Sequence, residues 1–286
     1  MLRSLFAGIS GLRANQTMLD VTGNNIANAN TIGFKASTTV FQDTLSQMLT
    51  GAAAAGNGRG GTNPVQVGLG VQVGAISTNF GQGSAETTGR NTDLMIQGDG
   101  MFVLADGNQQ LYSRAGAFTF DEQGTLVSPD GYRVQGYNTF DATGAHTGNP
   151  TDIKLQMTVP LAPPATGNAD LKSYNIGADG KVHGLYSDGS QRDIAQIAIA
   201  DFSNPMGLDK VGDTCFRESA SSGNAQVGGP GEGRNGTLVG GALEMSNVDL
   251  AAEFTNLILA QRGFQASSRV ITTSDQVLED LVNIKR

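Results

Sequence analysis

Large apolar residues recur every seven positions near both ends of the chain, and no such repeat runs through the middle. The row near the start comprises Leu5, Leu12, Leu19 and Ile26, with Ile9 in a partial second row. The row near the end comprises Leu250, Leu257, Phe264, Ile271 and Leu278, joined by Phe254, Ile258 and Leu281. A seven-residue repeat places a narrow apolar stripe on one side of a helix, where it packs against another helix. We call these residues the terminal apolar rows and expect them to form the interface between copies of the chain.

Local signals place the two predicted helices. The first runs from about residue 3 to residue 25, because Gly23 and the two asparagines after it weaken the helix and Gly33 ends it. The second begins after residues 246–249, which read SNVD and supply a capping oxygen and an acid for the first turn, and it runs to about residue 284. Such a length is typical of a bundle or coiled coil. The alternative is a helix pair within one chain, on a monomeric domain.

Between the helices the apolar pattern changes to period two. From Val65 onward alternate residues are apolar, as in a half-buried strand. Further strands are predicted over residues 93–96, 101–104, 117–120, 125–127, 132–137, 173–176, 181–185 and 194–202. Asp-Gly pairs at 106–107, 130–131, 179–180 and 188–189 tolerate the positive φ angles of tight hairpin turns, which indicates antiparallel strands. For residues 34–49 we predict an extended start followed by a short helical turn.

This layout predicts an α+β fold. Residues 1–30 and 248–286 form a discontinuous helical core domain, whose long helices build a coiled-coil core in a polymer. Residues 31–72 form a connecting segment, which contains a flexible loop rich in Gly and Ala at 51–61. Residues 73–247 form a mainly antiparallel, β-rich outer domain.

Composition and charge narrow the function classes. With 286 residues the chain is long enough for one large or two modest domains, and its formal charge of −8 argues against a nucleic-acid binder. No segment is apolar enough to span a membrane, so we expect no membrane insertion. The start of the chain resembles a signal peptide, but its apolar run is too short.

Candidate catalytic and metal-binding groups are sparse. The single cysteine, Cys215, excludes an internal disulfide and favours a buried structural role. His146 and His183 have no partner at metal-ligand spacing, and residues 98–100 (GDG) resemble a phosphate loop only in glycine content. We therefore expect no catalytic, cofactor-binding or metal-binding residues, and no enzyme activity. The alternative from another class is a secreted β-rich carbohydrate-binding protein or hydrolase. Such a protein would not explain why the terminal apolar rows are present.

Several segments resemble, in order, the signatures of the bacterial flagellar rod and hook proteins. They read NNIANANTIGFK at 24–35, TGRNTDL at 88–94, GDGMF at 98–102, YSRAG at 112–116, GALEMSNVDL at 241–250 and AQRGFQ at 260–265. Within this family, residues 28–31 and the ending LEDLVN at 278–283 resemble hook subunits. The distal rod subunit is the alternative, because its length and the spacing from Phe34 to Gly68 also fit. Many hook proteins carry an additional outer β domain, and here only about residues 141–169 have room for an insertion.

The resemblance implies a structural subunit of the flagellar hook, a flexible hollow tube that transmits torque from rod to filament as a universal joint. It implies self-association into a helical homopolymer, with the terminal helices lining a channel. The implied partners are the flagellar rod, hook cap and hook–filament junction proteins, and the flagellar type III export apparatus. It also implies an extracellular hook or basal-body location, reached without a cleaved signal peptide.

Overall fold

The computed structural model describes residues 2–54, 60–107, 109–140, 148–160 and 168–284. The chain packs as two compact units. The first, which we call the helical unit, comprises Met1–Ala29, Ala36–Asn79 and Val248–Arg286. The second, the β unit, comprises Asn30–Lys35 and Phe80–Asn247. The described residues thus give an α+β fold, with helices near both termini and mainly antiparallel strands in the middle, as the sequence predicts.

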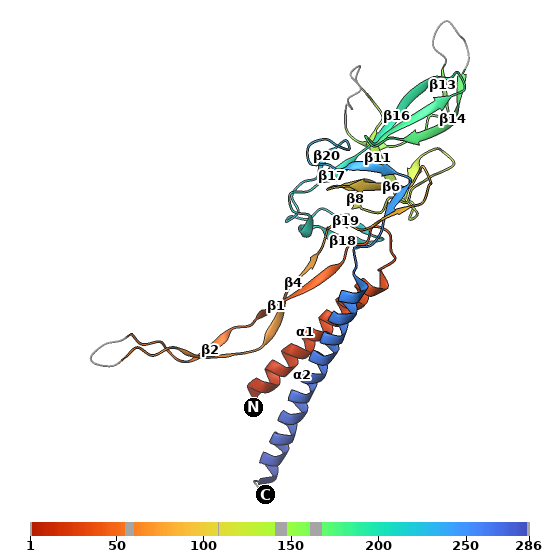
Figure 1. Cartoon of the computed structure of the whole chain (residues 1–286). Coiled ribbons are helices and arrows are strands. Elements are labelled where there is room, and N and C mark those ends of the chain that lie inside the picture. Colours follow the sequence, from red (N-terminus) through yellow and green to blue (C-terminus); the bar gives the residue numbers. More distant parts are fainter. Residues whose placement is uncertain (1, 55–59, 108, 141–147, 161–167, 285–286) are drawn as a thin grey trace. The chain divides into compact units, whose positions relative to one another are not determined.

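The two long helices lie side by side in the helical unit (Figure 1). Helix α1 spans Leu2–Ala27 and α2 spans Leu250–Ile284, which confirms the two predicted helices. The Oδ1 atom of Asp249 accepts hydrogen bonds from the backbone N–H groups of Ala251 and Ala252, at 2.9 and 3.2 Å. This cap satisfies N–H groups that have no partner inside the helix, and it explains why α2 begins there.

The helical unit also contains two strand pairs, and three of their four strands lie in segments that the sequence predicts as extended. Strand β1 (Ser37–Asp43) pairs antiparallel with β4 (Val71–Thr78), and β2 (Ser46–Thr50) pairs with β3 (Val65–Gly68). The short helical turn predicted within residues 34–49 is therefore wrong. Residues 38–41 read TTVF, and branched or aromatic side chains of this kind favour a pleated strand. Of the predicted loop at 51–61, residues 55–59 lie outside the described residues.

The β unit is built around a 14-stranded sheet in which each recorded strand pair is antiparallel. Its main path runs in the order β13-β14-β15-β16-β11-β7-β8-β19-β18. Those strands are β7 (Met101–Asp106), β8 (Gln109–Ser113), β11 (Arg133–Tyr137), β13 (Thr158–Pro160), β14 (Asn168–Ile176), β15 (Lys181–Tyr186), β16 (Gln191–Ile197), β18 (Asp209–Gly212) and β19 (Cys215–Arg217). Beside this path lie β9 (Thr119–Phe120), β10 (Leu126–Val127), β12 (Thr151–Asp152), β17 (Ile199–Asp201) and β20 (Gln226–Gly228).

Two further strand pairs and one short helix complete the β unit. Strand β21 (Thr237–Gly240) pairs with β6 (Leu94–Gln97), and β22 (Ala242–Glu244) pairs with β5 (Ala85–Thr87). A 3₁₀ turn, η1, spans Pro205–Gly207. The β22 strand ends a few residues before α2 begins, so the last part of the β unit leads directly into the C-terminal helix.

The predicted Asp-Gly turns and the core agree with the sequence pattern. The glycines at 107, 131, 180 and 189 all have positive φ, between 58° and 88°, which confirms the tight turns. Strands β6 and β7 contribute fully buried Leu94, Ile96 and Phe102 to the apolar core of the β unit. The Phe102 ring meets Phe118 edge-to-face at 5.0 Å between centroids. The buried residues of this apolar core all belong to the β unit.

Candidate assembly interface

Helices α1 and α2 meet through small residues in the helical unit. A Cβ placed on Gly8 would lie 3.2 Å from Ile271 Cγ1, and one on Gly11 would lie 3.0 Å from Ser267 Oγ. Farther along, a Cβ on Gly263 would lie 2.5 Å from Asn15 Oδ1. Glycine therefore permits the two backbones to approach closely, which larger residues would prevent. We call this contact the small-residue seam.

The helix pair is antiparallel, and its register is fixed by side-chain hydrogen bonds at both ends. Near the start of α1, Ser4 Oγ lies 3.3 Å from Ser274 Oγ. Near its end, Asn25 Nδ2 donates to Glu253 Oε1 at 3.1 Å, and both side chains are buried. Residues early in α1 therefore face residues late in α2 (Figure 1).

Asn25 also joins α1 to strand β1. Its Nδ2 donates to the Ser37 carbonyl at 2.7 Å, and its Oδ1 accepts the Ser37 backbone N–H at 3.0 Å. A side-chain amide can satisfy one donor and one acceptor of an extended backbone in this way. One buried asparagine thus holds α1, α2 and β1 together, and the sequence analysis did not single it out.

The terminal apolar rows are only partly covered within one chain. Ile271 packs against Gly8 at the small-residue seam. The half-buried members are Leu5, Leu12, Leu19, Ile26, Leu257, Phe264, Ile271 and Leu278. The exposed members are Ile9, Leu250, Phe254, Ile258 and Leu281. Part of the apolar surface of these rows is therefore uncovered in the single chain, and their role between copies stays a prediction.

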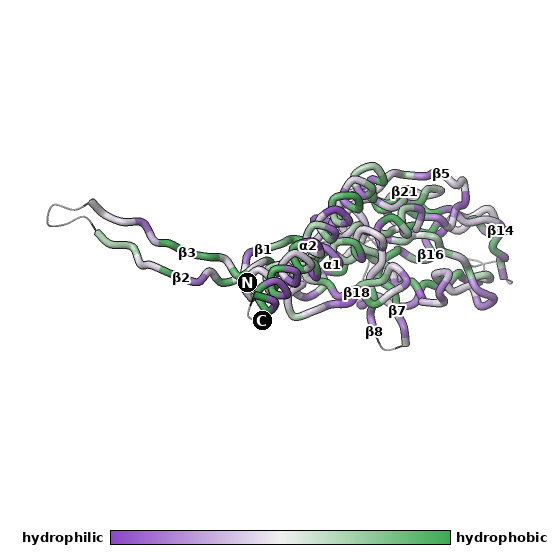
Figure 2. Tube along the Cα trace, turned by 90° about the horizontal axis from the view of Figure 1, so that it is seen from below, coloured by the Kyte–Doolittle hydropathy of each residue, from purple (hydrophilic) through white to green (hydrophobic). Residues whose placement is uncertain are grey.

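Other exposed apolar side chains lie outside the predicted rows. On the helices, the exposed fraction is 66% for Phe6, 60% for Leu259 and 65% for Val282. On the paired strands, Leu45 is 85% exposed and Met48 is 58% exposed. Figure 2 shows hydrophobic positions along both helices and along β3. A strict seven-residue repeat misses these residues, whereas a wider helical face counted at intervals of three and four includes Phe6 and Val282 but not Leu259.

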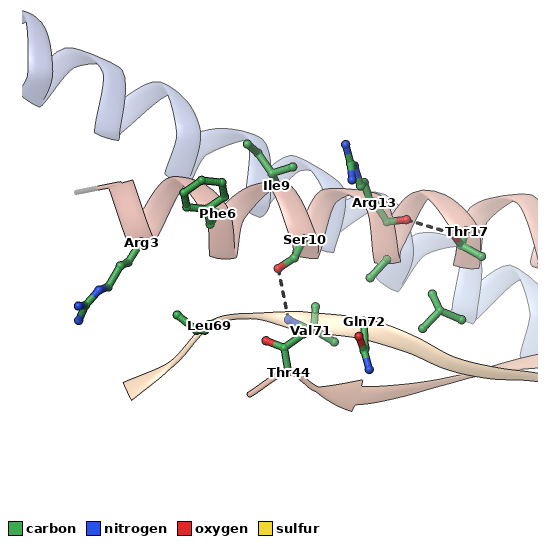
Figure 3. Close-up of a pocket in the computed structure, with 12 residues that line it drawn as sticks. Arg3, Phe6, Ile9, Ser10, Arg13, Thr17, Thr44, Leu69, Val71 and Gln72 are labelled. Carbon is green, nitrogen blue, oxygen red and sulfur yellow. Dashed lines mark hydrogen bonds between the residues drawn. The ribbon is translucent and has the colours of Figure 1, made fainter. Parts of the chain in front are cut away.

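A groove lies between α1 and the strands of the helical unit (Figure 3). It has a volume of about 610 Å³. Its lining residues are Arg3, Phe6, Ile9, Ser10, Arg13, Ala14 and Thr17 from α1, with Thr44, Leu69, Val71, Gln72 and Val73 opposite. We call it the α1–β4 groove.

One hydrogen bond joins the two walls of the α1–β4 groove. Ser10 Oγ accepts the backbone N–H of Val71 at 3.2 Å (Figure 3). The same hydroxyl donates to the Ala7 carbonyl at 2.9 Å. The preceding Gly70 has φ +126°, and a Cβ there would collide with Ser10 Oγ. This glycine allows β4 to begin directly against α1 and interrupts the strand pattern that starts at Val65.

The β unit holds a buried cluster of three charged side chains. Glu244 is fully buried, with Oε1 2.6 Å from Lys35 Nζ and Oε2 2.6 Å from Arg114 Nε. The Gly83 backbone N–H donates to Glu244 Oε1 at 2.9 Å. Burial by itself raises the pKa of Glu244, but the Arg114 charge and the hydrogen bonds from Lys35, Arg114 and Gly83 outweigh it and hold this pKa below its ordinary value.

The charged cluster brings together three of the sequence motifs. Lys35 closes the motif at 24–35, Arg114 lies in YSRAG, and Glu244 lies in GALEMSNVDL. The Arg114 guanidinium also donates to the carbonyls of residues 96, 98 and 100. The sequence does not predict that these three residues contact one another, because the chain contains many other acidic and basic residues that could form ion pairs.

The other candidate groups lie as follows. Cys215 is buried in β19, and burial raises the pKa of its thiol to about 11, which keeps it protonated at neutral pH. His183 Nδ1 lies 2.7 Å from Asp193 Oδ1 on the neighbouring strand, a pairing that sequence spacing did not indicate. His146 lies outside the described residues. Within the described ranges, no group of three or more His, Cys, Asp or Glu side chains is arranged to hold a metal ion.

Of the helices in the described residues, none combines the length and the apolar character that crossing a lipid bilayer requires.

Comparison with known protein families gives three matches along the chain. Residues 5–35 match the family described as "Flagella basal body rod protein". Residues 95–184 match "Flagellar hook protein FlgE/F/G D1 domain", and residues 239–284 match "Flagellar basal body rod FlgEFG protein C-terminal". The first and last matches cover much of α1 and α2, and the middle match lies within the β unit.

Comparison with individual proteins gives relatives of two kinds. The flagellar basal-body rod protein FlgG of Bacillus subtilis is 47% identical over 287 aligned positions, covering 100% of both chains. FlgG of Caulobacter vibrioides is 37% identical, covering 97% of both. The flagellar hook protein FlgE of Borreliella burgdorferi is 31% identical over 441 aligned positions, covering 100% of both.

Proposed function

The chain belongs to the family of bacterial flagellar rod and hook proteins, and from this premise we propose that it is a structural subunit of the flagellar rod. The observation that carries the proposal is the match of 47% identity along the full length of a basal-body rod protein. This favours the distal rod alternative of the sequence analysis over the hook interpretation.

Chain length supports the rod over the hook. The alignment with the Bacillus subtilis rod protein spans 287 positions for a chain of 286 residues, so it places almost no gap in this chain. The alignments with hook proteins of Borreliella burgdorferi and Escherichia coli span 441 and 416 positions, so they carry long gaps opposite this chain. The additional outer domain of many hook subunits has no counterpart of that size here.

We propose that the terminal helices form the inner wall of the tube. Residues 1–30 and 248–286 would supply this helical core, 31–72 the connection, and 73–247 the outer β domain. The small-residue seam supports this arrangement, because it joins α1 to α2 while leaving Phe254, Ile258 and other large apolar side chains exposed. Burial of one such side chain is worth about 1.5–3 kcal/mol, so contacts with neighbouring copies would stabilise a polymer.

The partners follow from this role. The family places the chain in the flagellum, where its members polymerise along the flagellar axis. We propose that the chain contacts other copies of itself and the adjoining rod and hook subunits, and that it reaches the growing end through the flagellar type III export apparatus. The hook cap and hook–filament junction proteins are partners only under the hook interpretation. The proposed role is structural and involves no enzymatic reaction.

The interface is tested by introducing charge where one chain leaves an apolar side chain exposed. Ile258 is 56% exposed, so Ile258→Asp should leave the single chain folded and remove one apolar contact between copies. We expect the protein concentration needed for polymer formation to rise roughly ten- to hundredfold. Sedimentation of concentrated full-length protein measures this concentration, and Leu12→Asp should act in the same direction.

Gln261→Asp provides the matched control, because it adds the same charge at an exposed polar position of α2. It should change the polymerisation concentration by less than about threefold. Circular dichroism must show that each variant keeps its helices. Normal polymers from folded Ile258→Asp protein would contradict the proposed interface.

A further inference from the structure

We propose that the α1–β4 groove of one copy receives the C-terminal end of α2 from a second copy. We call this end, residues 275–284, the α2 overhang. The inference rests on the proposed function, because it assumes a polymer, and it assigns one specific contact within it. The sequence pattern alone predicts helices that associate, whereas this contact joins a helix to a groove formed by a helix and a strand.

The α2 overhang extends beyond the end of α1. Ser274 faces Ser4 across the helix pair, and α1 begins only two residues before Ser4. Beyond residue 276, α2 therefore continues to Ile284 without α1 beside it (Figure 1). At about 1.5 Å per residue this uncovered part is roughly 12 Å long, or about two helical turns.

The α2 overhang carries apolar side chains that need a partner. The exposed fraction is 45% for Val277, 56% for Leu281, 65% for Val282 and 85% for Ile284. Leu278 and Leu281 are three residues apart and Val282 follows, so they share one face of the helix. The end of a helix with such a face is unstable in water unless another surface covers it.

The α1–β4 groove offers a surface of matching chemistry. Phe6 and Ile9 are 66% and 40% exposed in it, and Leu69 supplies an apolar side chain from the opposite wall. The hydrogen bond between Ser10 and Val71 joins the two walls. A groove that is already formed in the single chain loses little conformational freedom when a helix enters it.

Charge favours the same pairing. Arg3 and Arg13 line the groove, and within the described part of the chain neither guanidinium forms an ion pair. The α2 overhang contains Asp275, Glu279 and Asp280 and no basic residue. Opposite charges on two surfaces steer them together and disfavour incorrect partners. Lys285 and Arg286 follow the overhang and lie outside the described residues.

A chain cannot place its own overhang in its own groove. The groove is lined by α1 from Arg3 to Thr17, and that stretch of α1 lies beside α2 before Ser274. The overhang continues away from this region, so returning to it would require α2 to break. The occupant is therefore a second copy. Each copy would give one overhang and accept one, which is a head-to-tail contact that continues indefinitely and builds an open helical assembly.

A cysteine pair tests this contact in the full-length chain. Ile9→Cys combined with Leu281→Cys places one thiol in the groove and one on the overhang. Within one chain, residue 281 lies roughly 17 Å along the helix from the position opposite Ile9, whereas a disulfide needs Cα atoms about 4.4–6.8 Å apart. Oxidation of assembled protein should therefore give a ladder of linked copies on a non-reducing gel. Ile9→Cys with Leu259→Cys, which is exposed but outside the overhang, should give no ladder.

Charge reversal provides a second test. One variant carries Arg3→Glu and Arg13→Glu, and the other carries Asp275→Lys and Glu279→Lys. In an assembly of either variant alone, the groove and the overhang carry charges of the same sign and repel each other. We expect the polymerisation concentration to rise at least about tenfold. An equal mixture of the two should polymerise again, because each groove then meets an overhang of opposite charge. Arg217→Glu, at an exposed arginine of the β unit, should have no such effect.

The outcomes separate the two proposals. If the unmodified chain forms no polymer, the proposed function is overturned and this inference with it. If polymers form but the Ile9–Leu281 cysteine pair gives no ladder and the mixture stays unassembled, the inference alone is overturned. A ladder together with recovery in the mixture supports it.

Discussion

At the scale of single residues, buried polar side chains determine how distant segments meet. Asn25 joins α1 to β1 and α2 by three hydrogen bonds, and Glu244 joins Lys35 to Arg114. Groups of this kind are costly to bury unless each has its partner, so they disfavour alternative pairings of the same segments. The arrangement therefore depends on a few residues that contribute little apolar surface.

Removing the carboxylate from the buried cluster should destabilise the β unit. Glu244→Gln keeps the size of the side chain but leaves the Lys35 and Arg114 charges buried without a counter-charge. Loss of one partner from a buried pair costs about 3–5 kcal/mol. Denaturant unfolding of the full-length protein measures this loss. Asp209→Asn removes an exposed partner of Arg217 and should cost less than about 1 kcal/mol, so equal losses in both variants would contradict the account.

The same variant gives a pH dependence with a defined sign. Because the folded pKa of Glu244 is below its ordinary value of 4.5, its contribution to stability is fully present well above pH 4.5 and is lost as the pH falls through the folded pKa. The stability difference between the unmodified protein and Glu244→Gln should therefore shrink on acidification below that value. A difference that grows in acid would contradict the assigned role.

At the scale of elements, the small-residue seam decides how α1 and α2 pack. Gly8 lies against Ile271, and the Ser267 carbonyl would be 3.5 Å from a Cβ placed there. Gly23, in the same helix, has no atom within 4 Å of the corresponding position. The same substitution at both glycines therefore distinguishes two effects. At Gly8 it disturbs the contact between the helices, whereas at Gly23 it changes only the helix propensity.

Gly8→Leu should separate the two helices, and Gly23→Leu should not. A larger residue in a packed contact costs about 1–3 kcal/mol, which exceeds the gain of about 0.5–1 kcal/mol from replacing glycine in a helix. Gly23→Leu should show only this gain in helix stability, because it disturbs no contact. Thermal unfolding followed by the helical circular dichroism signal should show a lower midpoint for Gly8→Leu and an equal or higher one for Gly23→Leu. Equal midpoints would mean that Gly8 does not lie in a tight contact.

The success of the sequence predictions differs between elements for a physical reason. The helices and the Asp-Gly turns were predictable, because their signals are local: a repeat, a capping residue, or a glycine with positive φ. Strands β2 and β18 were not, since every residue in them is exposed and no apolar alternation marks them. A strand without a buried face is specified by its partner rather than by its own sequence.

At the scale of the whole molecule, the sequence predicts association but not its geometry. The terminal apolar rows indicate that α1 and α2 pack against helices, yet the seam of Gly8, Gly11 and Gly263 is invisible to a search for large apolar residues. The buried cluster at Glu244 and the α1–β4 groove depend on segments more than 50 residues apart in sequence, so no local pattern reports them. The proposal of a rod subunit rests on the length of the chain and its identity to relatives, and not on the seven-residue repeat.

Electron cryomicroscopy of assemblies formed by the full-length chain would show which part of the chain lines the tube. We expect straight hollow tubes whose inner wall consists of α1 and α2 from many copies, with the β unit outside. A map of that kind would also show whether the α2 overhang occupies the groove of a neighbouring copy. Single compact particles at high concentration, or tubes lined by the β unit with the helices away from the channel, would contradict it.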